Sequence, residues 1–144
     1  MKKLLVASIA LVILTAAASA AVLPRFAPAG DIVVTVTYTG KGKVDDTHEI
    51  LVFLFDHPTP VAASEPLAKQ VTTKSGGTVT FKDVAQDPVY VTVVYDEAAN
   101  YDGNSPPPVG APISSYQKDG KPIPVKPGPT AKIKVSFDDS RRWK

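Results

Sequence analysis

Apolar and polar residues alternate along much of this chain, and the alternation predicts β-strands. In residues 31–39 (DIVVTVTYT), every second side chain from Ile32 to Tyr38 is apolar, while threonines fill most positions between them. Residues 131–137 (AKIKVSF) repeat the pattern, with lysine and serine between the apolar positions. A period of two is typical of a strand with one buried and one exposed face.

Two further segments predict more deeply buried strands. Residues 48–56 (HEILVFLFD) are apolar on both alternating sets of positions, which is typical of a central strand. Residues 88–96 (PVYVTVVYD) are rich in valine and tyrosine, which favour strands. Between them, residues 67–83 read as a hairpin around a Gly-Gly turn, and Asp119-Gly120 predicts a second tight turn.

No segment after residue 20 shows a sustained helical period, whereas six or seven short strands recur with turn signals between them. The sequence therefore predicts an all-β domain over residues 31–138, an antiparallel β-sandwich of about seven strands. An immunoglobulin-like strand order is one arrangement that fits this pattern. In a simple meander, Asp96 would lie at the same end as Asp45 and Asp46, and Asp56 at the opposite end with residues 138–139.

The first 20 residues read as a secretory signal peptide. Lys2 and Lys3 form a basic start, residues 4–14 an apolar stretch, and Ala18-Ser19-Ala20 a cleavage site. We expect cleavage before Ala21, a signal helix that is removed, a leader over residues 21–30 and a solvated charged tail over residues 139–144. The product would be periplasmic or secreted, with no membrane span after cleavage.

The charge balance and the absence of cysteine argue against several classes of function. The chain has 16 basic and 14 acidic side chains, and Lys2 and Lys3 leave with the signal peptide, so the exported part is nearly neutral. This balance gives no reason to expect a nucleic-acid partner. The chain has no cysteine, which excludes disulfides, thiol nucleophiles and zinc-thiolate sites.

The loop behind the valine-rich strand carries the candidate metal ligands. Its oxygen-bearing residues are Asp96, Asn100, Asp102 and Asn104, the hard ligands that calcium prefers. The loop is not an EF-hand, since Tyr101 stands where that motif needs glycine when counted from Asp96. Calcium therefore stays a hypothesis, to which the nearby Asp45 and Asp46 could contribute. The alternative is that these residues simply tolerate turns.

Tyrosines flank the same loop and form a second hypothesis. Tyr95, Tyr101 and Tyr116 could offer stacking faces to a sugar or a peptide, with Asp102 and Asn104 supplying hydrogen bonds. Tyrosines at strand ends also commonly cover the rim of a core. The sequence leaves both interpretations open.

Catalysis has little support in the sequence. His48 and His57 are nine residues apart across a predicted strand, roughly 30 Å when extended, so they cannot share a metal. His57 follows Asp56, but no G-x-S-x-G nucleophile motif exists, and Ser64 lies in a proline-rich loop with no base in view. We therefore expect that the protein is not an enzyme.

Several short stretches carry a family resemblance. They are GTVTFKDV at 77–84, PVYVTVVYDE at 88–97, DGN at 102–104 and G-x-P at 110–112. These stretches resemble the prealbumin-like (transthyretin-like) domains of exported bacterial proteins, a group that overlaps carboxypeptidase regulatory-like domains.

The chain is also similar to an uncharacterised exported family in which a strand ends in His-Asp-Glu-Asn-Gly-Asn. Asp96, Glu97 and Asn100 match that ending, while Tyr95 stands for the histidine and Ala98-Ala99 for the Asn-Gly. The resemblance implies a non-catalytic module with a binding or structural role at the cell envelope, whose partner is a protein or a glycan. A carbohydrate-binding module that uses the loop tyrosines is the alternative.

Overall fold

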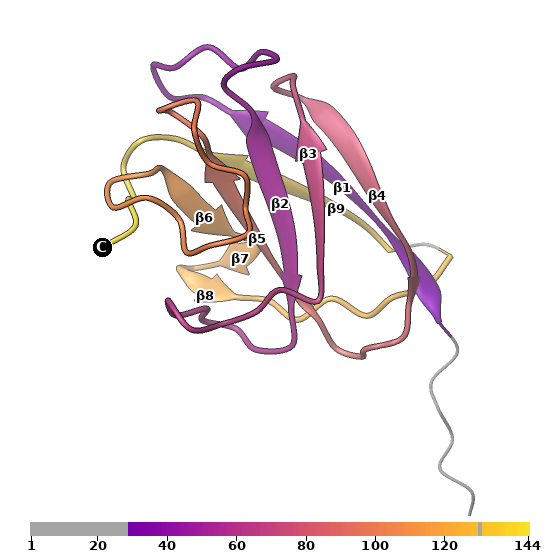
Figure 1. The fold of residues 1–144 in the computed structure, drawn as a ribbon. Helices are drawn as coiled ribbons and strands as arrows, with labels where there is room; N and C mark the ends of the chain where they lie inside the picture. Colours follow the sequence, from indigo (N-terminus) through magenta and orange to yellow (C-terminus); the bar gives the residue numbers. More distant parts are fainter. Residues whose placement is uncertain (1–28, 130) are drawn as a thin grey trace, which may run out of the picture.

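All regular elements in the described part of the chain are β-strands (Figure 1). The structure is a computed structural model that describes residues 29–129 and 131–144. The predicted signal peptide and most of the leader lie outside these residues. The strands are β1 (Gly30–Tyr38), β2 (Ile50–Phe55), β3 (Ala68–Thr72), β4 (Gly77–Val84), β5 (Tyr90–Tyr95), β6 (Ile113–Ser115), β7 (Gln117–Lys118), β8 (Lys121–Pro122) and β9 (Lys132–Phe137).

Seven of these strands form two sheets that face each other. One sheet has the order β4-β1-β9 and the other the order β3-β2-β5-β6, while β7 and β8 form a separate short hairpin. One cluster of buried side chains contains residues from both sheets, so the sheets share a core. The all-β prediction is thus confirmed, and the arrangement is compatible with a β-sandwich.

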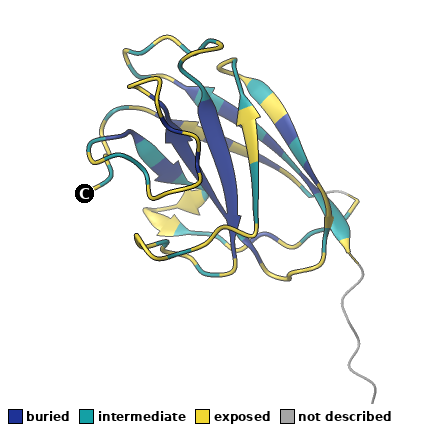
Figure 2. Cartoon of the chain, viewed as in Figure 1, coloured by how far each residue is buried: buried dark blue, intermediate teal, exposed yellow. Residues whose placement is uncertain are grey.

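The alternation along the strands decides which side chains fill this core. The apolar positions of β1 and β9 identified in the sequence are buried, and the positions between them are more exposed. Strand β2 is buried on both faces along its whole length (Figure 2). Val52 and Leu54 face the shared core, whereas Leu51, Phe53 and Phe55 belong to a second apolar cluster.

The sheets are not wholly antiparallel, because β9 pairs with β1 in parallel. This pairing brings the ends of β1 and β9 to the same end of the molecule. Asp139 accepts hydrogen bonds there from the backbone N–H of Lys41 at 2.9 Å and from the Tyr38 hydroxyl. The expectation that residues 138–139 lie at the Asp56 end is therefore wrong, since the meander it assumed has no parallel pair.

The predicted hairpin between residues 67 and 83 is also wrong. Strand β3 pairs with β2 and β4 pairs with β1, so the Gly-Gly turn passes the chain from one sheet to the other. Local turn chemistry cannot distinguish these outcomes, because the partner of each strand is set by distant residues. The turn at Asp119-Gly120 is confirmed: it joins β7 to β8, and both residues have positive φ angles, as tight hairpins require.

The C-terminal tail is exposed at most of its side chains but is bound through its backbone. Pro112 and Arg142 form an antiparallel bridge, and the Trp143 N–H donates to the Ala111 carbonyl at 2.9 Å. The Arg142 guanidinium lies 2.7 Å from the Glu97 carboxylate. The tail predicted to be free in solvent thus pairs with the segment before β6.

Candidate functional site

The loop that follows β5 folds over the outer face of the four-stranded sheet. Tyr101 in this loop is only 7% exposed and belongs to the second apolar cluster, with its ring 6.3 Å from that of Phe53. The Tyr101 hydroxyl donates to the Ser105 carbonyl at 3.0 Å. The loop therefore acts as a cover for apolar side chains that the sheet would otherwise expose to water.

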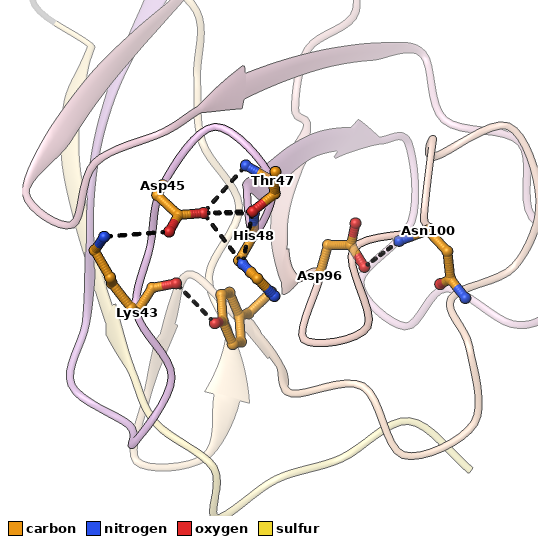
Figure 3. A network of polar contacts seen from close by, with 7 residues as sticks. Lys43, Asp45, Thr47, His48, Asp96 and Asn100 are labelled. Atoms are coloured by element: carbon orange, nitrogen blue, oxygen red, sulfur yellow. Dashed lines mark hydrogen bonds and ion pairs between the residues drawn. The ribbon is translucent and has the colours of Figure 1, made fainter.

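Asp96 shapes the start of this loop. Its side chain is buried, at 6% exposure. One carboxylate oxygen accepts the backbone N–H of Asn100 at 3.2 Å, and the other accepts that of Tyr101 at 3.1 Å. Both oxygens are thus used in holding the backbone of the loop. Figure 3 shows the bond to Asn100.

Asp102 and Asn104 form a separate polar group. The Asp102 carboxylate accepts the backbone N–H and the side-chain amide of Asn104, both at 2.9 Å. These bonds hold the pKa of Asp102 below its ordinary value, the backbone donor contributing most. The Lys69 ammonium adds two bonds, to the Asp102 carbonyl and, at 3.0 Å, to the Asn104 side-chain oxygen.

The four candidate calcium ligands are therefore divided between two hydrogen-bonded groups. Within residues 29–129 and 131–144, no three histidine, aspartate or glutamate side chains lie close enough together to hold a metal ion. The Asp96 carboxylate makes the bonds that a turn-forming residue makes, in agreement with the simpler alternative stated above.

Asp45 lies at the same end as Asp96, as expected, but it serves its own turn (Figure 3). Its carboxylate accepts the Thr47 hydroxyl at 2.8 Å and the backbone N–H of His48 at 3.0 Å, and the Lys43 ammonium lies 3.4 Å away. Hydrogen bonds from Thr47, followed by those from His48, hold the pKa of Asp45 far below its ordinary value. The hypothesis that Asp45 completes a metal site with Asp96 gains no support from this geometry.

The tyrosine hypothesis is wrong for two of its three residues. Tyr95 is 1% exposed, stacks on Tyr38 at 4.3 Å between ring centroids, and donates its hydroxyl to the Lys43 carbonyl at 3.0 Å. Tyr101 is buried beneath its loop, so neither ring offers a free face. Tyr116 is partly buried and packs against the shared core. The alternative, that these rings cover the core's rim, describes them better.

Buried tyrosines give the protein a predictable response to base. Burial raises the pKa of Tyr101 to about 12, and burial raises the pKa of Tyr95 as well. Both phenols ionise near pH 10 in an unfolded chain. The pKa of each of these two phenols is therefore higher in the folded protein than in the unfolded chain. The stability that comes from burying the neutral phenols is complete below about pH 10 and falls as the pH rises towards 12.

We therefore expect urea midpoints to fall from about pH 10 upwards. Ultraviolet absorbance of the phenolate should show that Tyr101→Phe lacks a group titrating near pH 12. A native spectrum in which every tyrosine ionised at about 10 would contradict the burial of these rings.

A narrow apolar groove remains open beside the covering loop, and the sequence analysis missed it. Phe53, Phe55 and Val94 form its floor, and residues 60–66 and 103–107 form its walls. Trp143 of the tail reaches its rim, and the free volume is about 40 Å³. The one available signal was the apolar character of both faces of β2, because an antiparallel sheet with an apolar outer face needs a cover.

Gly103 lets the loop approach the sheet closely. Its φ is 72°, and a β-carbon there would meet the Lys69 side chain at 2.6 Å and Leu51 at 2.8 Å. Gly110 also has a positive φ, of 90°, but a β-carbon there meets nothing within 4 Å. Alanine at position 110 would therefore suffer backbone strain alone, whereas alanine at position 103 would suffer backbone strain and steric crowding.

Gly103→Ala should lower the free energy of unfolding by about 2 to 3 kcal/mol, and Gly110→Ala by about 1 kcal/mol, measured by urea denaturation. The difference is the cost of displacing Leu51 and its neighbours. Equal losses in the two variants would mean that the loop does not press on the sheet at Gly103.

The comparisons with known proteins give no family assignment. No protein-family model, curated protein or solved structure matches this chain. Within the described residues, the structure has no helix with the length and apolar character needed to cross a bilayer.

Proposed function

We propose that this chain is an exported, prealbumin-like binding module of the cell envelope, which holds an apolar side chain of a partner protein in the groove above Phe53 and Phe55. The observation that carries the proposal is the groove itself. The covering loop buries the second apolar cluster, so Phe53, Phe55 and Val94 are at most 6% exposed, yet a space of about 40 Å³ remains above them between the two loop walls. A small concave site with an apolar lining is typical of a recognition site.

Strand order supports the prealbumin-like alternative over the immunoglobulin-like one. An immunoglobulin sandwich places its first two strands in the same sheet. Here β1 and β2 lie in different sheets, and β1 lies between β4 and β9. This order departs from the immunoglobulin-like one, so the prealbumin-like alternative is left with the support of the stretches that resemble it in sequence.

The chemistry of the groove favours an apolar occupant over a glycan. Four of its lining residues are prolines, which have no N–H to donate: Pro60, Pro66, Pro106 and Pro107. The Tyr101 hydroxyl is already bonded to the Ser105 carbonyl. A sugar would lose its bonds to water here and regain few of them. The small free volume suits one aliphatic or aromatic side chain, presented on a protein segment, better than a pyranose ring.

An array of decapeptides, each with one central apolar residue among polar ones, tests the proposal. Ala62 is exposed on the wall of the groove, so Ala62→Trp should fill the groove and weaken peptide binding about tenfold or more, without disturbing the core. Ala85→Trp makes the same change at an exposed position outside the groove and should bind as wild type does. Equal binding by wild type and Ala62→Trp would overturn the proposal.

A further inference from the structure

Three polar side chains form a continuous hydrogen-bonded network that ends at Ser64, which lines one wall of the groove. His57 Nδ1 lies 2.5 Å from a carboxylate oxygen of Asp56, and His57 Nε2 lies 2.8 Å from the Ser64 hydroxyl oxygen. The His57 ring is also held edge-on against Phe55, at 5.5 Å between centroids. Ser64 is half-buried and lines the groove together with its apolar floor.

The positions of the protons on Asp56, His57 and Ser64 follow from the chemistry of these three side chains. An ionised Asp56 only accepts hydrogen bonds, so His57 must carry its proton on Nδ1. In the neutral ring, Nε2 is then an acceptor, and the Ser64 hydroxyl must be its donor. The backbone N–H of Val61 donates to the same Ser64 oxygen at 2.9 Å, which favours negative charge on that oxygen. This is the proton arrangement that a serine nucleophile requires.

We propose that Ser64, His57 and Asp56 form a serine-nucleophile site that hydrolyses carboxylic esters with a small apolar acyl group. Ser64 is the nucleophile, His57 the general base, and Asp56 a positioning residue that acts through His57. The choice of acyl group rests on the groove of the proposed function, whereas the nucleophile does not depend on it. The site escaped the sequence analysis because its serine lies outside any known motif and is brought to His57 by the loop.

The reaction is balanced with water as the second reactant. The Ser64 oxygen bonds to the ester carbonyl carbon while its proton passes to His57 Nε2. The bond from that carbon to the alcohol oxygen then breaks, and the alcohol leaves with the proton from Nε2. Water attacks the acyl-serine with the help of the same base, which releases the carboxylic acid and restores Ser64.

The same loop contains backbone N–H groups that could donate hydrogen bonds to the oxyanion formed during the reaction. The backbone N–H groups of Ala62, Ala63 and Glu65 donate to no other atom within residues 29–129 and 131–144. These residues and Ser64 line an open hollow, whose other side is formed by residues 103–106. Exposed amides of this kind can bind an oxyanion once a substrate excludes water. Asp56 is half-exposed to solvent, which predicts a modest rate.

Labelling with diisopropyl fluorophosphate, followed by peptide mass spectrometry, tests the nucleophile without depending on the groove. The expected result is one phosphorylated residue, Ser64, with labelling slowed at least about 100-fold in His57→Gln. Asp56→Asn should lower the maximal labelling rate but leave the half-saturating reagent concentration unchanged. Ser136→Ala, which alters an exposed serine on β9 outside the groove, should label as wild type does. Absence of a Ser64 adduct, or equal labelling in His57→Gln, would overturn the proposal.

A thiol variant keeps the test decisive if Ser64→Ala or His57→Gln disturbs the loop. The chain has no cysteine, so Ser64→Cys introduces its single thiol. Beside His57 this thiol should react with iodoacetamide at least about tenfold faster at neutral pH than the thiol of Ser105→Cys. Equal rates would show that His57 activates nothing at position 64. Loss of peptide binding in Ala62→Trp with Ser64 labelling intact would separate the two proposals.

Discussion

Phe53→Ala is expected to lower the free energy of unfolding by about 4 kcal/mol, at least as much as a truncation in the shared core. Phe53 points to the outer face of the four-stranded sheet, yet it is only 3% exposed, because the loop that carries Tyr101 lies over it. Removing the ring loses its burial and leaves a void between sheet and loop. Urea denaturation, with a constant slope, would measure the loss.

Leu54→Ala is the matched comparison, since Leu54 is the next residue in β2 and faces the shared core with no exposure. We expect a loss of about 3 to 4 kcal/mol there, and less than about 1 kcal/mol for Val71→Ala on the exposed edge strand β3. A Phe53→Ala loss as small as that of Val71→Ala would mean that the loop does not cover the outer face in solution.

The strands could be predicted because each has a recognisable pattern of apolar residues over a short stretch of sequence. The alternation in β1 and β9 and the apolar character of both faces of β2 are properties of six to nine consecutive residues. Which strands pair with each other cannot be seen in any such local pattern. The parallel contact of β1 with β9, and the passage of the chain between sheets after β3, depend on residues up to a hundred positions apart.

Little of the candidate site could be predicted from the sequence, in which no motif marks the groove. The polar residues of the loop after β5 were interpreted as ligands because a sequence shows oxygen atoms and not their hydrogen-bond partners. Asp96 satisfies backbone donors of its own loop, and Tyr101 turns inward. Conversely, Ser64 gave no signal because its relation to His57 exists only once seven residues have turned back.

Asp96→Ala is expected to lower the free energy of unfolding by about 2 to 3 kcal/mol. The substitution removes two hydrogen bonds to a carboxylate and leaves the buried backbone N–H of Tyr101 without its acceptor. The loop should then loosen over the outer face, so the hydrogen-exchange protection of residues 100–105 should fall with it. Urea denaturation and amide exchange would measure the two effects.

Asp96→Asn keeps one acceptor oxygen and should lose about half as much stability, whereas Asp102→Ala should change little, since its carboxylate bonds an exposed Asn104. Adding millimolar calcium distinguishes an Asp96 carboxylate that holds the loop backbone from one that binds a metal ion. If the carboxylate only holds the loop backbone, calcium leaves the melting temperature of the wild type unchanged. A calcium-dependent rise that Asp96→Ala abolishes would instead mean that the loop rearranges around a metal, because bound calcium must stabilise the folded state.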